Sequence, residues 1–166
     1  PSDPLAGELG LEEQMAGTPI SQTNYATCQG DYKNDTGTGL LPTYGNVYGN
    51  SVNLKPVRGI IGRFNWSAKP REIPDGMSKT FCFGECIGIV CITQSYGSQS
   101  FATTAHPINY QNDSVLADLA TPSNPRWDET IAFRSMHSGG AVFGMGDGSI
   151  HFIEELIDGV IYRGLA

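Results

Sequence analysis

Two side chains that could take part in chemistry, His137 and Asp147, are separated by nine residues near the end of the sequence. The apolar runs 141–145 and 150–153 predict two short strands, and the Gly-Asp-Gly-Ser run at 146–149 predicts the turn of a β-hairpin. In such a hairpin the two side chains lie at opposite ends of one strand, roughly 15 Å apart at ~3.3 Å per residue. Joint catalysis by the pair is therefore disfavoured.

A structural role is the preferred interpretation of both residues. We expect His137 to tie the start of its strand to a neighbouring backbone carbonyl, and Asp147 to accept hydrogen bonds from the amides of its turn. Gly139, Gly140 and Gly148 belong to the same structural motif. A metal or ligand site and a catalytic role are the alternatives, and both need partners that the sequence alone does not bring together.

The other serines and histidines nearby do not complete a recognisable hydrolase or zinc site. Three serines lack the Gly-x-Ser-x-Gly elbow of serine hydrolases, namely Ser135, Ser138 and Ser149. His106 and His151 lie 31 and 14 residues from His137, and these separations match no short zinc motif. We expect His151 to be exposed, because it alternates with apolar neighbours along its strand.

Calcium matches the sequence better than zinc does. Asp31, Asn34 and Asp35 gather carboxylate and amide oxygens in one polar, glycine-rich stretch, and hard cations prefer such ligands. The stretch lacks the spacing of an EF-hand. A calcium site is one prediction for this stretch and a solvated polar turn is the other, and no further cofactor is indicated.

Four cysteines, Cys28, Cys82, Cys86 and Cys91, permit disulfide bonds, buried thiols or a metal site. Their spacing lacks the paired Cys-x2-Cys pattern of structural zinc sites. Within one strand, Cys82 and Cys86 would lie ~13 Å apart on the same face, too far for a direct bond. We expect at least one disulfide among the four, with buried thiols as the alternative.

Further sequence blocks follow one another in a fixed order along the chain. They are Pro1-Ser2-Asp3-Pro4, Thr23-Asn24-Tyr25-Ala26 with Gly30, the segment 73–85 with Asp75-Gly76, Ser78, Thr80 and Gly84-Glu85, then His106-Pro107-Ile108-Asn109, and Ile157-Asp158 with Tyr162. Together with His137 and Asp147-Gly148, they resemble the prepilin-type, His-X9-Asp-Gly family of pseudopilin-like bacterial envelope proteins.

This resemblance implies a pilin-like α+β fold, with a small antiparallel β-sheet, long loops and short helices in a single globular domain over residues 1–166. It also implies that the chain is the C-terminal portion of a protein whose N-terminal helix, absent from this sequence, is the membrane or filament anchor. The implied location is extracytoplasmic, at the cell surface or outside the cell. Copies of the chain, and secretion or envelope components, are the implied partners.

Local patterns place further elements around the hairpin, which we expect at the centre of the sheet. Strands are predicted at 59–65, 80–85 and 88–93, whereas residues 1–46 are expected to be irregular. A long polar connection is expected at 94–125. Asp158 is the predicted N-cap of a short final helix, in which Val160 and Ile161 follow at helical spacing.

Composition excludes some functions. The 166 residues fit one domain, and charged residues make up only 16% of them, against an average of about 25%. The net charge is −7, from 17 acidic and 10 basic residues, and the basic residues are scattered. Nucleic acid and anionic membrane surfaces are therefore disfavoured as partners, because both require clustered Lys and Arg.

The function that these observations favour is non-catalytic. We expect a structural subunit of an extracytoplasmic pilin-like or surface filament, which assembles with copies of itself. The nearly uncharged segment 94–125 supplies candidate interface residues, namely Tyr96, Phe101 and Tyr110. A cell-surface module that binds glycans or another ligand is the alternative, and a metal-dependent hydrolase is the third hypothesis.

Overall fold

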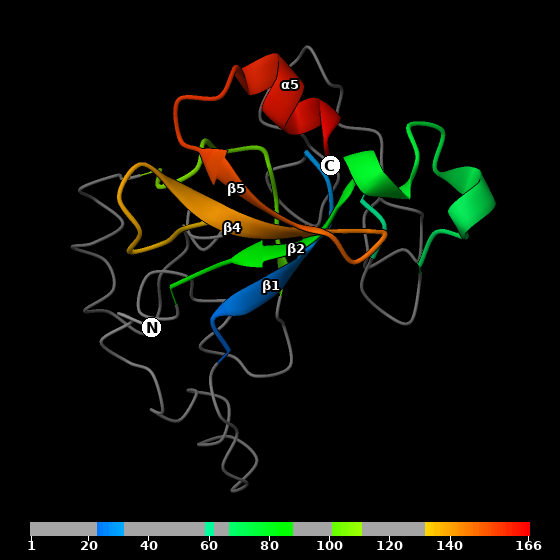
Figure 1. Ribbon diagram of the computed structural model, residues 1–166, viewed down its shortest axis with the longest axis horizontal. Helices are drawn as coiled ribbons and strands as arrows, with labels where there is room; N and C mark the ends of the chain where they lie inside the picture. Colours follow the sequence, from blue (N-terminus) through cyan, green and yellow to red (C-terminus); the bar gives the residue numbers. More distant parts are fainter. Residues whose placement is uncertain (1–22, 32–58, 62–66, 88–100, 111–131) are drawn as a thin grey trace, which may run out of the picture.

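The computed structural model describes residues 23–31, 59–61, 67–87, 101–110 and 132–166, which form one five-stranded β-sheet with short helices (Figure 1). The strands are β1 (Tyr25–Cys28), β2 (Phe81–Glu85), β3 (Phe101–Ala102), β4 (Gly140–Met145) and β5 (Ile150–Glu154). Two 3₁₀ helices, η2 (Pro70–Glu72) and η3 (Met77–Lys79), precede β2, and the helix α5 (Gly159–Gly164) follows β5. The predicted α+β fold with a small sheet and short helices is confirmed.

The sheet has the strand order β3-β1-β2-β4-β5, so β2 is the central strand. The hairpin of β4 and β5 forms where the sequence predicts it, but its expected central position is wrong, because β5 is an edge strand. The pairings β1–β2, β2–β4 and β4–β5 are antiparallel, as expected for the sheet. The short pairing of β1 with β3 is parallel.

Two stretches that we expected to be irregular contribute strands. Residues 25–28 form β1, and Phe101 lies in β3 with its side chain only 2% exposed. The expectation that Phe101 lies at an intermolecular interface is therefore wrong, because its ring packs inside the domain. Tyr110 is half-buried, and its ring stacks on that of His106. Tyr96 lies outside the described residues.

The strands predicted at 59–65 and 88–93 are not among the strands of the described sheet. Within the described part of the first, Ile61 makes an isolated bridge with Ser67 and does not join the sheet. Residues 62–65 and the whole of 88–93 lie outside the described residues. The strand predicted at 80–85 forms as β2.

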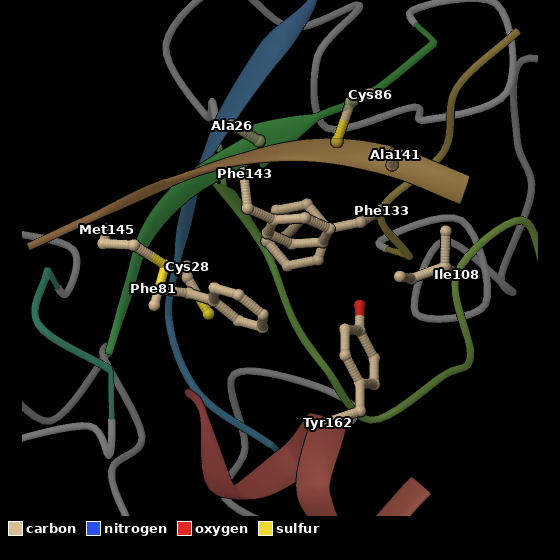
Figure 2. Packing of buried hydrophobic residues seen from close by; sticks show 11 residues of the cluster. Ala26, Cys28, Phe81, Cys86, Ile108, Phe133, Ala141, Phe143, Met145 and Tyr162 are labelled. Carbon is tan, nitrogen blue, oxygen red and sulfur yellow. The ribbon is translucent and has the colours of Figure 1, made fainter. Parts of the chain in front are cut away.

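The hydrophobic core lies between one face of the sheet and α5, and aromatic rings dominate it (Figure 2). The ring of Phe81 stacks on that of Phe143 at a centroid distance of 4.2 Å, and Phe133 meets Phe143 edge-on at 4.9 Å. Tyr162 rises from α5 toward these rings, 5.9 Å from Phe81. Contacts of this kind contribute about 0.5–1.5 kcal/mol each beyond the area they bury.

The helix α5 begins where the sequence predicts. The carboxylate of Asp158 accepts hydrogen bonds from the backbone N–H groups of Val160 and Ile161, as an N-cap residue does. At the other end, the carbonyl of Leu165 accepts a hydrogen bond from the N–H of Phe81, which fastens the end of α5 to the central strand. Within the described residues, none of the helices combines the length and apolar content needed to cross a bilayer.

The core leaves no room for a side chain at position 84. A Cβ on Gly84 would lie 2.7 Å from ring carbons of both Phe133 and Phe143. Because overpacking a filled core costs about 1–3 kcal/mol, we expect Gly84→Ala to lower the free energy of unfolding by that amount in urea denaturation. Gly164→Ala is the matched control, since a Cβ at Gly164 meets nothing within 4 Å. If the two variants lose equal stability, this account of Gly84 is wrong.

Candidate functional site

Asp147 stabilises the turn of the β4–β5 hairpin. Its Oδ1 accepts hydrogen bonds from the backbone N–H of Ser149 at 2.9 Å and from the Ser149 hydroxyl at 2.7 Å. These donors favour the ionised form and hold the pKa of the Asp147 carboxyl below its usual range. Gly148 adopts φ = 87° and donates its N–H to the Met145 carbonyl. The predicted role of Asp147 in accepting turn amides is confirmed.

The segment that leads into β2 fastens the same turn from the other side. The backbone N–H of Asp147 donates to the carbonyl of Met77, and that of Gly146 donates to the carbonyl of Thr80. A Cβ on Gly146 would lie 2.7 Å from the Ile60 side chain. The blocks at 73–85 and 146–149, far apart in the sequence, therefore meet at one end of the sheet.

Ser149 and His151 are adjacent in space, but not in the order of a catalytic triad. The Ser149 hydroxyl donates its proton to Asp147, while His151 Nε2 lies 3.1 Å from the same oxygen. Which of these two atoms donates depends on the tautomer of the imidazole, and the serine hydroxyl, which bonds to Asp147, does not lie between a histidine base and an incoming group as in a hydrolase triad. His151 is exposed, as predicted, but the alternation that was its basis is wrong, because its apolar neighbours Ile150 and Phe152 are exposed and His151 is paired with the buried Phe143.

His137 lies at the opposite end of β4 and forms an ion pair with Glu85. The distance from His137 Nε2 to Glu85 Oε1 is 3.3 Å, and the side chains are 56% and 14% exposed, respectively. The expected partner, a backbone carbonyl, is therefore wrong for the imidazole ring. Only the backbone N–H of His137 bonds locally, to the Ser135 hydroxyl. His137 and Asp147 do not meet, as the hairpin geometry predicts.

The Glu85 side chain bonds to β4 at the point where the β2–β4 pairing ends. The β2–β4 pairing ends at Gly84 and Phe143, and the Glu85 carbonyl accepts the N–H of Arg134 instead. The next N–H along β4, that of Val142, donates to Glu85 Oε2 at 2.8 Å. The carboxylate thus replaces the missing strand partner with one oxygen and binds His137 with the other.

Asn109 connects three chain segments beside this ion pair. Its backbone adopts φ = 57°, which asparagine tolerates better than most residues. Its N–H donates to the Phe133 carbonyl, its Oδ1 accepts the N–H of Ser135, and its Nδ2 donates to Glu155 Oε2 at 2.8 Å. Two of these bonds fix the backbone that leads into β4, and the third reaches the residue that follows β5.

Arg134 is a buried residue at this end of the sheet. It is 4% exposed, and both Nε and Nη2 donate to the Tyr110 carbonyl. Sequence reasoning missed the roles of Glu85, Arg134 and Glu155 here. The family resemblance could have indicated the role of Glu85, because Gly84-Glu85 and His137 belong to the same set of sequence blocks.

The remaining sequence predictions concern metals and thiols. Asp31 is buried, and Asn34 and Asp35 lie outside the described residues, so the calcium site stays a prediction. In the part of the chain that the structure describes, no group of three acidic, histidine or cysteine side chains is arranged to hold a metal ion. Cys28, Cys82 and Cys86 form no disulfide in the structure, and Cys91 lies outside the described residues.

Both polar clusters bind the protein's own backbone. An imidazole beside a carboxylate can move protons, but one oxygen of Glu85 already accepts the Val142 N–H. Asp147 is likewise engaged with Ser149. The arrangement is therefore suited to holding the two ends of β4 in place.

Comparison with known proteins identifies the family. A family model described as protein of unknown function (DUF1559) matches residues 1–159, which is nearly the whole chain. The chain therefore belongs to the DUF1559 family. No curated protein and no solved structure matches it.

The two partners of the Glu85–His137 pair should differ in their importance for stability. Glu85→Leu leaves the Val142 N–H without an acceptor, and we expect a loss of about 1–3 kcal/mol in the free energy of unfolding. His137→Ala should cost less than about 1 kcal/mol, because this side chain is more than half exposed. Glu85→Gln, which keeps an acceptor, is the matched control and should fall between them. A larger loss for His137→Ala than for Glu85→Leu in urea denaturation would contradict this order.

The Asp147 turn should lose stability in acid. Because the folded-state pKa of Asp147 is depressed, its stabilisation is present above the unfolded-state pKa of about 3.9 and is lost as the pH falls through the folded-state value. We expect Asp147→Asn to be tolerated at neutral pH, with a small decrease in Tm that disappears at the acid end of this window.

Gly148→Val provides the pH-independent comparison. Valine resists the φ of 87°, so the variant should lose roughly 1 kcal/mol or more at every pH. Thermal melts of the wild type, Asp147→Asn and Gly148→Val between neutral pH and pH ~2 test both expectations. The lower limit lies below the ordinary pKa of an aspartate carboxyl. A Tm difference for Asp147→Asn that grows as the pH falls would contradict the assigned role of the carboxylate.

Proposed function

We propose that this member of the DUF1559 family is a non-catalytic structural subunit that assembles with copies of itself outside the cytoplasm, as a pilin-like protein does. One observation carries the proposal. The face of the sheet that points away from α5 carries three exposed apolar side chains, next to an edge strand that no described strand covers.

Side chains of four strands make up this face, which we call the outer face. Along each strand, residues alternate between the core and the outer face. The register places Thr27, Phe83, Gly144 and Ile150 in one row across β1, β2, β4 and β5. Its apolar members are Tyr25, Phe83, Val142, Ile150 and Phe152, of which Tyr25, Ile150 and Phe152 are 47%, 59% and 50% exposed.

Glycines in β4 bring the aromatic rings of the outer face close to the backbone. A Cβ on Gly140 would lie 2.8 Å from the Phe152 ring, and one on Gly144 would collide with the Phe83 ring. Tyr25 in turn meets Phe83 edge-on at 6.0 Å. The rings of Phe83 and Phe152 therefore lie close to the backbone of the sheet. Contiguous exposed apolar surfaces of this kind commonly mark interaction sites.

The edge strand β5 offers hydrogen-bonding groups beside the outer face. Its odd-numbered positions bond to β4, as the bonds from Met145 N to the Ser149 carbonyl and from Glu155 N to the Gly139 carbonyl indicate. The N–H and C=O groups of Ile150, Phe152 and Glu154 therefore point away from β4. An open edge is a template for pairing with another strand.

A second copy satisfies both features together. Antiparallel pairing of β5 with β5 of a second molecule about a two-fold axis continues the sheet and places the two outer faces side by side. Such an interface needs about 1,000 Å² of buried surface to be stable, so the rings next to the edge must contribute. The low share of charged residues, 16% of the chain, limits the number of ions that association must desolvate.

A ligand-binding function is the second candidate. The exposed ring of Tyr25, supported by Phe83, presents an aromatic surface on which a sugar ring can stack. This alternative needs the outer face to remain accessible in the native assembly, whereas self-association covers it.

Charge substitution on the outer face tests the proposal. We expect Phe152→Lys and Ile150→Lys to weaken self-association by at least about tenfold, equivalent to 1.4 kcal/mol, because a charge buried between copies is costly. Analytical ultracentrifugation over a range of concentrations measures association, and circular dichroism checks that the domain is folded. Leu156→Lys is the matched control, because Leu156 is 90% exposed and follows the strand.

Two results would contradict self-assembly. One is a wild-type chain that stays monomeric at every concentration reached, with no filament in electron micrographs of the native source. The other is equal weakening by Leu156→Lys and Phe152→Lys. If the chain is monomeric and Tyr25→Ala abolishes retention on immobilised oligosaccharides, the ligand-binding function replaces the structural one.

A further inference from the structure

The pairing of β1 with β2 leads toward Cys28 and Cys82. The antiparallel register aligns Tyr25 with Glu85, Ala26 with Gly84 and Thr27 with Phe83. Continued by one step, this register aligns Cys28 with Cys82. Cys28 is the last residue of β1 and Cys82 the second residue of β2, although 53 residues separate them in the sequence.

The hydrogen-bond pattern gives the spacing of this pair. The N–H of Cys86 donates to the Asn24 carbonyl at 2.8 Å, so that pair is hydrogen-bonded, and every second pair of an antiparallel ladder repeats the pattern. The aligned cysteines fall on this repeat, where the Cα atoms of partners lie ~5.5 Å apart. Disulfide bonds need Cα atoms between about 4.4 and 6.8 Å, and this spacing lies within that range.

Cys28 faces the core, and a β-bulge sets the direction of the Cys82 side chain. Ala26 and Gly84 point into the core, since Ala26 is buried and a Cβ on Gly84 would meet Phe133 and Phe143. Alternation along β1 also turns Cys28 toward the core, where it is fully buried, whereas Cys82 is half-buried. Cys82 is the extra residue of a β-bulge between Phe81 and Phe83, and bulges re-aim side chains at the rims of sheets.

Cys86 does not compete for either thiol. It lies four residues beyond Cys82 on the same chain, ~13 Å away along an extended strand. Its Sγ is directed toward the Ala132 carbonyl, at 3.9 Å. Among the described cysteines, Cys28 and Cys82 are thus the pair whose backbone positions fit a disulfide.

We propose that Cys28 and Cys82 are a disulfide site, which closes under oxidising conditions and joins β1 covalently to the central strand. The oxidant is a low-molecular-weight disulfide. Its S–S bond is broken by a cysteine thiolate, which forms a mixed disulfide and releases one small thiol. The second cysteine then attacks the protein sulfur of the mixed disulfide and releases the other small thiol. Two protein thiols are oxidised, one small disulfide is reduced to two thiols, and the protons balance.

The environment of the two thiols orders these steps. Cys28 is fully buried, and burial raises the pKa of its thiol to about 12, whereas Cys82 is half-buried with a pKa raised by the same cause. Thiolates are the attacking species, so both steps are slow in the folded protein. Cys82 reacts first because it is the accessible thiol, and the bond closes most readily while the chain is folding.

The bond joins strands that the backbone alone connects through residues 29–81. Crosslinks stabilise a protein mainly by restricting its unfolded chain, and long enclosed segments gain most. This inference is independent of the proposed self-association, because neither cysteine is among the outer-face residues on which that proposal rests.

Peptide mapping of the refolded chain tests the proposal. The full chain is refolded in a mixture of reduced and oxidised glutathione, remaining thiols are alkylated, and the protein is digested without reduction. Trypsin alone leaves Cys82, Cys86 and Cys91 in one peptide, because no Lys or Arg lies between them. A second cleavage after Glu85 separates Cys82 from the other two. We expect a crosslinked peptide that contains Cys28 and Cys82.

Stability provides the second readout. We expect the oxidised wild-type protein to melt roughly 5–12 °C above the reduced protein, and Cys82→Ser to lose this difference. Cys86→Ser is the matched control and should keep it. Alkylation of all four thiols after refolding, or a crosslink that joins Cys28 or Cys82 to a different cysteine, would overturn the assignment. These results do not depend on whether the chain self-associates, so the two proposals fail separately.

Discussion

The stacking of Phe81 on Phe143 is the contact around which the rest of the structure is arranged. It joins the central strand β2 to β4, and the rings of Phe133 and Tyr162 pack against it from a preceding loop and from α5. Because these rings fill the space beside β2, position 84 must be glycine. The same crowding explains why β2 is central: its core face is covered by aromatic side chains that come from three other segments.

Polar residues hold the two ends of β4 while this stack holds its middle. At one end, the Asp147 turn bonds to its own amides and to the carbonyls of Met77 and Thr80. At the other end, Glu85 binds the Val142 N–H and His137. The His and Asp of the motif therefore act separately, each at a place where a strand begins or ends and its backbone groups need partners.

Local patterns account for the parts of the fold that the sequence predicts well. The hairpin follows from alternation and a glycine-rich turn, and α5 follows from the Asp158 cap, since both depend on neighbours a few residues away. The strands β1 and β3 were missed because they contain four and two residues and are defined by partners far along the chain. The Glu85–His137 pair was missed for the same reason, because it spans 52 residues. The burial of Phe101 likewise depends on its non-local pairing with Thr27.

Most residues of the family pattern make contacts within the domain. The pattern therefore predicts the fold of this chain better than its function. Gly84, Glu85, Asn109, His137 and Asp147 all belong to the blocks of the resemblance, and each contacts the backbone or rings of its own domain. Two of the three exposed apolar residues of the outer face, Ile150 and Phe152, are outside those blocks, whereas Tyr25 lies within one. The residues on which the proposed self-association rests therefore lie largely outside the family pattern, which is why that pattern predicts contacts within the domain better than contacts with a partner.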